Sequence, residues 1–102
     1  MKQILVRYKV KPDLADENQR YIENVFEELR RNSPAGIRYA SFKQTDGVSF
    51  VHLASIETED ESNPLIQSQA FQAFQAGIKD RCAEQPIAIE LEEVGTYHFF
   101  EN

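Results

Sequence analysis

The chain has 102 residues, of which 17 are acidic and 11 are basic, so its net charge is −6 at neutral pH. A charge of this sign repels polyanions, which argues against nucleic acids and acidic membranes as partners. Leu, Ile, Val and Phe supply about a quarter of the residues, enough for one hydrophobic core, so a single domain is expected over residues 1–102.

The first predicted element is a strand over residues 4–10, because apolar and polar side chains alternate there with a period of two. One face of this strand carries Ile4, Val6, Tyr8 and Val10. A helix is predicted over residues 14–31, where apolar side chains recur at helical spacing and most charged side chains fall elsewhere. Pro12 and Asp13 suit the start of this helix.

Two further strands are predicted over residues 37–44 and 48–56, joined as a hairpin. Asp46-Gly47 is a strong signal for a two-residue type I′ turn, in which both central residues adopt positive φ. That turn would place Ser41 opposite His52. One face of the hairpin would then carry Ala40, Phe42, Val51 and Leu53. The other face would carry Ile37, Tyr39, Ser41, Phe50, His52, Ala54 and Ile56.

The C-terminal part of the chain predicts a second helix over residues 65–82, with Phe71, Phe74, Ile78 and Cys82 facing inward. A fourth strand is predicted over residues 87–91. Residues 97–102 form an aromatic C-terminal tail, which we expect to pack on the sheet of its own subunit or of a partner. The order of elements predicts an α+β protein with the ferredoxin-like βαββαβ fold and a four-stranded antiparallel sheet.

Right-handed crossovers place both helices on the same face of such a sheet, so the chain itself leaves the other face uncovered. The hairpin is apolar on both faces, and an exposed apolar face of this size usually marks an interface. We therefore expect a homodimer that packs sheet against sheet. The faces in contact would carry Ala40, Phe42, Val51 and Leu53.

A short first strand ends in Val10-Lys11-Pro12, a long amphipathic helix and a hairpin follow, and Ser68-Gln69-Ala70-Phe71-Gln72-Ala73-Phe74 opens the second helix. In this pattern nearly the full chain resembles the antibiotic biosynthesis monooxygenase family of dimeric α+β barrels. The resemblance implies a homodimer and a cofactor-independent oxidation of quinols or aromatic polyketides. The family's haem-degrading branch is not expected, because the chain has no tryptophan and no histidine on its second helix.

The strongest candidate site is the group of polar side chains on the hairpin face that we expect the helices to cover. His52 is predicted to accept the proton of a phenol, and Tyr39 to orient it, so these are the predicted catalytic residues. The predicted substrate-binding residues are Tyr8, Ser41, Phe50, Phe71 and Phe74. The alternative interpretation is a core histidine that is satisfied by Ser41 and serves packing alone.

The remaining reactive groups predict no further site. The acidic run Glu57, Glu59, Asp60 and Glu61 lacks the spacing of a calcium loop, so a solvated loop is expected and no metal. No glycine-rich phosphate loop is present, so no cofactor is expected. The single cysteine, Cys82, indicates a cytoplasmic protein and a buried, unreactive thiol. The apolar run at the N-terminus is too short for a signal peptide or a membrane span.

Two rival functions come from other classes. The segment from Asp46 to Leu53 is partly similar to the third strand of RNA-recognition motifs, but an acid stands where those motifs have a basic residue. A non-catalytic binding or structural protein with the same dimeric fold is the stronger rival. An enzyme needs open volume beside His52, whereas a structural dimer would fill it with Tyr39, Phe71 and Phe74.

Overall fold

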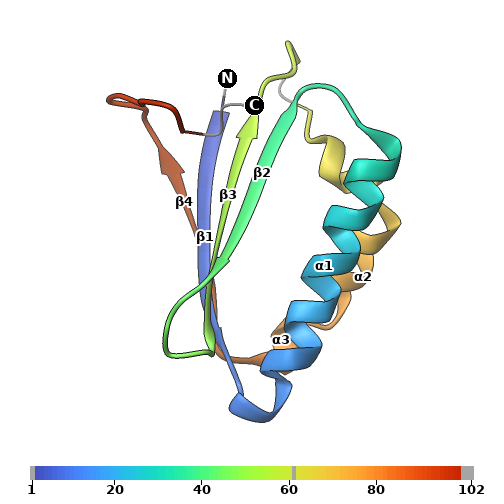
Figure 1. The fold of residues 1–102 in the computed structure, drawn as a ribbon, viewed down its shortest axis with the longest axis vertical. Coiled ribbons are helices and arrows are strands. Elements are labelled where there is room, and N and C mark those ends of the chain that lie inside the picture. Colours follow the sequence, from blue (N-terminus) through green and yellow to red (C-terminus); the bar gives the residue numbers. More distant parts are fainter. Residues whose placement is uncertain (1, 61, 100–102) are drawn as a thin grey trace.

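The computed structural model describes residues 2–60 and 62–99. The elements in chain order are β1 (Lys2–Val10), α1 (Ala15–Asn32), β2 (Ile37–Lys43), β3 (Ser49–Ile56), α2 (Gln69–Ala76), α3 (Ile78–Arg81) and β4 (Cys82–Leu91). Two short 3-10 helices precede α1 and α2, at Pro12–Leu14 and Pro64–Gln67. The helices lie together on one side of the sheet, as Figure 1 shows, and this confirms the predicted α+β architecture.

The sheet has the strand order β2-β3-β1-β4, and neighbouring strands pair antiparallel. The predicted hairpin register is confirmed, since Ser41 pairs with His52. On the other side of β3, Tyr8 of β1 pairs with Phe50. Because paired residues share a face and alternate residues along a strand do as well, Tyr8, Ser41 and His52 all point toward the helices.

The hairpin turn differs from the predicted two-residue type I′ turn. The backbone N–H of Gly47 donates to the carbonyl of Gln44 at 3.0 Å, and of the two predicted turn residues only Gly47 has a positive φ, at 78°. The Asp46 carboxylate accepts hydrogen bonds from the N–H groups of Val48 and Ser49, at 3.0 and 2.9 Å. These bonds to the aspartate stabilise a longer loop and keep the register unchanged.

The second helical region is divided where a single helix was predicted over residues 65–82. The side chain of Ser68 accepts a hydrogen bond from the N–H of Phe71 at 3.0 Å and so caps the start of α2. Gly77 separates α2 from α3. A glycine inside a helix lowers helix propensity by about 1 kcal/mol relative to alanine, which favours an interruption at this point.

The last strand is longer than the prediction of residues 87–91, because β4 begins at Cys82. Pro86 lies inside this strand although proline has no N–H to donate. The structure accommodates it because β4 is an edge strand and its pairing with β1 shifts register between Arg7 and Lys9. Proline is tolerated at edges and at bulges of this kind.

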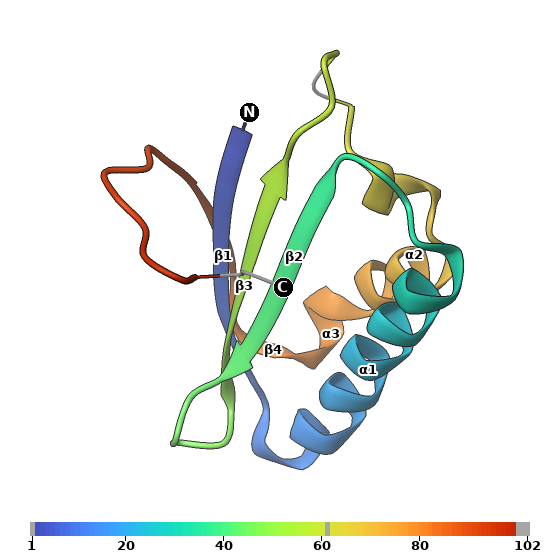
Figure 2. The same ribbon diagram turned by 45° about the horizontal axis from the view of Figure 1, so that its top comes forward.

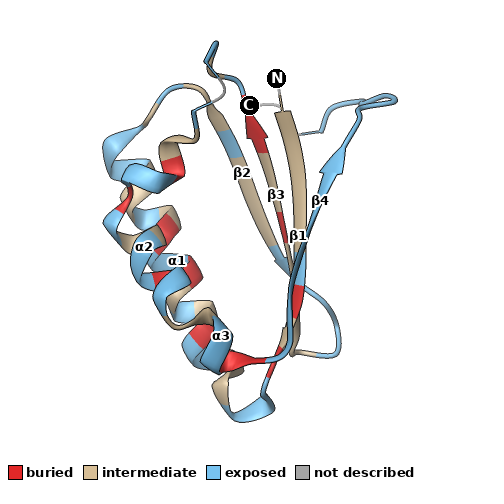
Figure 3. Cartoon of the chain, turned by 180° about the vertical axis from the view of Figure 1, so that it is seen from behind, coloured by how far each residue is buried: buried red, intermediate tan, exposed pale blue. Residues whose placement is uncertain are grey.

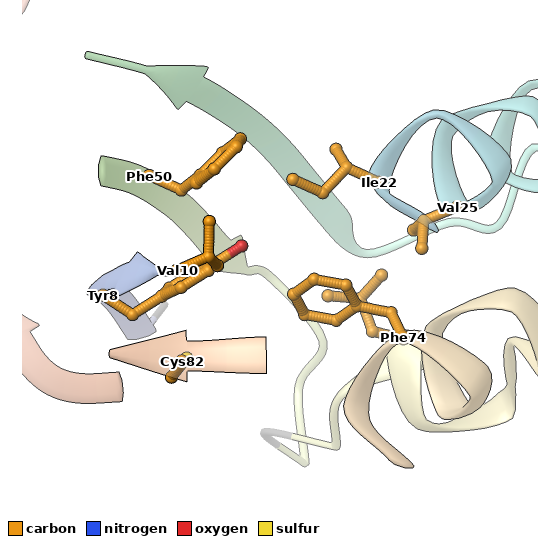
Figure 4. Close-up of a cluster of buried hydrophobic side chains, with 8 residues drawn as sticks. Tyr8, Val10, Ile22, Val25, Phe50, Phe74 and Cys82 are labelled. Atoms are coloured by element: carbon orange, nitrogen blue, oxygen red, sulfur yellow. The ribbon is translucent and has the colours of Figure 1, made fainter. Parts of the chain in front are cut away.

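The hydrophobic core lies between the sheet and the helices, as Figure 4 shows in close-up. Its buried members are Tyr8, Val10, Ile22, Val25, Phe50, Leu65, Phe74 and Cys82. In Figure 3 the buried residues of the helices line the side that faces the sheet. Each large aliphatic side chain buried in this way contributes about 2 kcal/mol to the hydrophobic stabilisation.

The opposite face of the sheet is not covered by helices, as predicted, and it is apolar. Exposed hydrophobic side chains on its strands are Phe42, Ile87, Ile89 and Leu91. Figure 2 shows the segment after β4 extending away from the helices. Tyr97 in that segment is 86% exposed and so does not pack on its own sheet. Residues 100–102 of the predicted tail lie outside the described residues.

Candidate functional site

His52 lies at the centre of the candidate site, on β3 between β1 and β2, and only 4% of it is exposed. On one side of the ring, Nδ1 is 2.6 Å from Ser41 Oγ and 2.8 Å from Tyr39 Oη. Ser41 and Tyr39 are two residues apart on β2, so their side chains leave the same face of the sheet. The structure therefore brings together the three polar residues that the sequence predicted.

On the other side of the ring, His52 Nε2 is 2.8 Å from the hydroxyl oxygen of Tyr8. That oxygen also accepts a hydrogen bond from Nδ2 of Asn18 on α1, at 2.9 Å. Asn18 in turn accepts from Nε of Arg81 on α3, at 3.0 Å. Asn18 is fully buried and Arg81 is 3% exposed. A continuous hydrogen-bonded chain thus crosses the core from the helices to the sheet.

Aromatic rings surround the imidazole. The ring centroids of Tyr8, Tyr39 and Phe74 lie 5.3, 5.8 and 5.5 Å from that of His52. Phe71 packs edge-on against Tyr39, with the centroids 6.4 Å apart. Of the predicted substrate-binding residues, Tyr8, Phe71 and Phe74 therefore belong to the packed shell around His52.

Burial sets the ionisation of this cluster. It lowers the pKa of His52 to about 4 and raises the pKa of Tyr39 to about 12. It also raises the pKa of Tyr8 above its usual value. Removing a charged group from water disfavours the charged form, which explains the direction of all three shifts. At neutral pH the imidazole and both phenols are therefore uncharged.

A groove of about 340 Å³ opens beside this cluster, between α1 and the edge strand β2. Its walls consist of Gln19, Ile22, Glu23, Phe26, Arg30, Ser41, Phe42, Lys43 and Phe50. Ser41 and Phe50 were predicted to bind a substrate, and Ser41 joins the groove to His52. Phe26 and Phe42 add aromatic surface that the sequence did not reveal as part of a site.

A larger cavity of about 690 Å³ lies at the other end of the molecule, between the sheet and the segment after β4. Leu53, Tyr97 and Phe99 contribute to its walls, but no residue of the His52 cluster does. Its titratable lining residues are Arg38, Glu57, Glu92, Glu93 and Tyr97, and no histidine is among them. The smaller groove is thus the better candidate for a ligand near the polar cluster.

Two members of the cluster, Asn18 and Arg81, were missed from the sequence. The sequence analysis assigned no role to Asn18. Its spacing was informative, however, since Asn18 precedes Ile22 by four residues and Val25 by seven, and all three are buried. Arg81 lies seven residues after Phe74, again at helical spacing. A polar residue on an apolar helical stripe is the signal that identifies such positions.

The other reactive groups stand apart from this cluster. Burial raises the pKa of Cys82, whose neighbours are core residues, and this favours an unreactive thiol. In the acidic loop, Glu57 pairs with Arg38 at 3.1 Å. Within residues 2–60 and 62–99 no group of His, Cys, Asp and Glu side chains is arranged to hold a metal ion. In the same ranges, no helix is long and apolar enough to span a membrane.

No protein-family model matches the sequence, and no curated protein matches it. Solved structures do match. An antibiotic biosynthesis monooxygenase has a TM-score of 0.75 and 14% identity, over 93% of this chain and 100% of the other. SnoaB, a cofactor-independent oxygenase from Streptomyces nogalater, has a TM-score of 0.68 and 13% identity, over 93% of this chain and 94% of the other. A conserved protein from Methanosarcina mazei has a TM-score of 0.72 and 14% identity, over 90% of this chain and 91% of the other.

At these identities the matches show a shared fold over nearly the whole of each chain. The chain therefore has the fold of the antibiotic biosynthesis monooxygenases, as the sequence resemblance predicted.

Proposed function

We propose that this protein is a cofactor-independent oxygenase of a small phenol or quinol, with the groove between α1 and β2 as its binding site. The observation that carries the proposal is the contact of Ser41 Oγ, on the groove wall, with Nδ1 of the buried His52. A likeness in fold to SnoaB, a cofactor-independent oxygenase, supports it. His52 and Tyr39 are the proposed catalytic pair.

The walls of the groove suit an aromatic ring. Phe26 and the edge residue Phe42 lie along the groove, and Ser41 supplies a polar atom that can orient one oxygen of the ligand. Behind Ser41, the hydroxyl of Tyr39 and the imidazole of His52 complete the group that exchanges hydrogen with that oxygen. Tyr8, Phe71 and Phe74 keep water away from the imidazole by packing around it.

The proposed reaction uses dioxygen as its only co-reactant. One phenol and one dioxygen give one quinone and one water, so one oxygen atom enters the ring and the other leaves as water. Loss of the phenolic proton makes the ring electron-rich enough to react. Full transfer of that proton from a phenol of pKa about 10 to an imidazole of pKa about 4 is uphill by about 8 kcal/mol.

This cost is compatible with turnover, because a rate of about one per second corresponds to a barrier of about 17 kcal/mol. It does mean that His52 is a weak base in the folded protein. The direction in which hydrogen moves between His52 and the ligand depends on which ring nitrogen carries the proton.

The test is oxygen consumption by the purified protein, without added cofactor, over a panel of phenols and quinols. Tyr39→Phe keeps the ring that stacks on Phe26 but removes the hydroxyl next to Nδ1. We expect it to lower kcat/KM by about 100-fold, in the range of lost acid–base assistance. Tyr97→Phe, at an exposed tail residue, is the matched control and should keep the wild-type rate.

The proposal fails if the wild-type protein oxidises no member of the panel, or if Tyr39→Phe oxidises them at the wild-type rate. The panel should include single-ring and fused-ring phenols, because a groove of about 340 Å³ has room for either.

A second candidate is a non-catalytic structural or binding protein. It is favoured by the packing around His52, whose two ring nitrogens both have hydrogen-bond partners and whose ring is enclosed by Tyr39 and Phe74. Such a shell stabilises the core without any ligand. Under this alternative no phenol or quinol is oxidised, and a purely structural protein also binds no aromatic ligand in the groove.

For either function we propose a homodimer that packs through the uncovered sheet face. Phe42 is 47% exposed there, and Ile87, Ile89 and Leu91 extend the apolar surface along β4. A second copy of the chain supplies a matching apolar face by a two-fold rotation, so each copy covers the other. The expected location in the cytoplasm is likewise a proposal, consistent with a free cysteine.

A further inference from the structure

The hydrogen-bonded chain behind His52 has a direction that follows from which atoms can donate. A guanidinium group has only donors, so the contact of Arg81 Nε with Asn18 identifies Oδ1 as the atom facing Arg81. The amide nitrogen of Asn18 must then be the atom that faces Tyr8. It donates to the hydroxyl oxygen of Tyr8 at 2.9 Å.

Tyr8 keeps one hydrogen to donate, and His52 Nε2 lies 2.8 Å from its oxygen. In the described part of the chain no other acceptor contacts this hydroxyl, which is buried. If Nε2 itself carried a proton, the Tyr8 hydroxyl would be a buried donor without an acceptor. The free energy of removing that hydroxyl from water would then not be offset by a hydrogen bond. Nε2 is therefore the acceptor, and the proton of the neutral His52 lies on Nδ1.

Nδ1 faces Ser41 Oγ and Tyr39 Oη, at 2.6 and 2.8 Å, so it donates to this pair of hydroxyls. Since Nδ1 donates, neither hydroxyl uses its own hydrogen on His52. Because Ser41 is the member that lines the groove, its hydroxyl hydrogen is available there to a ligand.

The charges at the two ends of this series of hydrogen bonds, at Arg81 and at the groove, favour a ligand oxygen that carries no proton. At the inner end, Arg81 has the Phe74 carbonyl and the Tyr21 and Phe74 rings as its other partners, and within the described residues no carboxylate contacts it. At the groove, the charged residues are Glu23 and Arg30 of α1 and Lys43 of β2, with the cations in excess.

We propose that the groove binds its aromatic ligand as a phenolate, with the hydroxyl of Ser41 as hydrogen-bond donor to the anionic oxygen. Asn18 and Arg81 act as positioning residues, since they hold the proton of His52 on Nδ1 and so keep Ser41 a donor. A series of donors oriented toward one point stabilises negative charge there. The proton of the phenol passes to solvent when the ligand ionises.

This inference rests on the proposed function for the aromatic nature of the ligand. It changes the role expected of His52 in the reaction. The histidine donates toward the groove rather than accepting the proton of the substrate. The substrates would accordingly be phenols acidic enough to ionise near neutral pH.

The probe is a nitrophenol, whose ionised form is yellow, so its ionisation in the groove can be followed by absorbance without any turnover. We expect the wild-type protein to bind the phenolate at least about tenfold more tightly than the neutral phenol, which displaces the ionisation curve of the bound probe by about one pH unit to acid. Ser41→Ala should abolish most of this displacement.

Asn18→Asp tests the positioning role. The carboxylate would still accept from Arg81, but it cannot donate to Tyr8, so Tyr8 would donate to it instead and accept from Nε2–H of His52. Nδ1 would become an acceptor, and the preference for phenolate should fall by about tenfold. Asn24→Asp places the same charge on the exposed side of α1 and should leave the preference unchanged.

Nitrogen NMR of the wild-type protein reads the tautomer directly and does not depend on any variant. The proposal predicts a proton on Nδ1 of His52, and a proton on Nε2 overturns it. It is also overturned if nitrophenol fails to bind, if both forms bind equally, or if Asn18→Asp behaves as Asn24→Asp. A protein that prefers phenolate but oxidises nothing would refute the proposed oxygenase while leaving this inference intact.

Discussion

Burial of His52 as a neutral imidazole makes the stability of the protein depend on pH in a defined way. The pKa of His52 is about 4 in the folded protein and about 6.5 in an unfolded chain. Between these values the unfolded state binds more protons, so the free energy of unfolding falls as the pH falls. At pH 4.5 the loss attributable to His52 is about 2 to 3 kcal/mol, whereas at pH 7.5 it is close to zero.

This loss is a large part of the 5 to 15 kcal/mol typical of small domains, so it is readily measured. Denaturant unfolding of the wild-type protein and of His52→Gln, at fixed protein concentration, gives the comparison. His52→Gln is expected to be less stable at pH 7.5 but to lose about 2 to 3 kcal/mol less on acidification. Parallel curves for the two proteins between pH 7.5 and 4.5 would refute the reasoning.

Exposed carboxylates do not affect this comparison. Hydrogen bonds lower the pKa values of Glu28, Asp46 and Asp60 in the folded protein, so their contributions are also lost on acidification. They are present in both proteins and cancel in the difference.

Two further predictions concern the sheet face and a turn. Phe42→Asp should convert the proposed dimer to a monomer at micromolar protein concentration, as measured by analytical ultracentrifugation. Ile66→Asp, at a similarly exposed apolar residue outside the sheet, should leave the dimer intact. A wild-type protein that is itself a monomer would rule out the dimer. Gly36→Ala should destabilise the protein by more than about 1 kcal/mol, because φ is 83° and a Cβ would lie 2.5 Å from Thr58 Cγ2. Gly95→Ala meets no atom within 4 Å, and equal melting temperatures for these two variants would contradict the prediction.

The strands and the hairpin register could be predicted because period-two patterns and the Asp46-Gly47 turn act locally. Once the register was known, Tyr39, Ser41 and His52 had to share a face, and the structure places them in contact. The turn type itself was wrong, because the hydrogen bonds of the Asp46 carboxylate stabilise a longer loop than the dipeptide indicates.

The rest of the cluster depends on tertiary packing, which local patterns do not encode. Asn18 and Arg81 are polar residues on helices, and polar helical residues usually face water. Here each satisfies the other in the core, so helical spacing could mark them as buried but could not predict the hydrogen bond between them. The early start of β4 was missed for a similar reason, since only the bulge opposite β1 makes Pro86 compatible with a strand.

The site also explains why the sequence could not distinguish an enzyme from a structural protein. Both interpretations need the same buried His52 and the same aromatic shell. They differ in whether the groove beside Ser41 receives a ligand, and the groove is formed by Phe26 of α1 together with Phe42 of β2, which are distant in the sequence.

A crystal structure of the protein with bound nitrophenolate would test the central claim most directly. We predict the ring in the groove between α1 and β2, with its oxygen within hydrogen-bond distance of Ser41 Oγ. A ligand found only in the cavity beside Tyr97, or a ring in the groove whose oxygen points away from Ser41, would contradict the account.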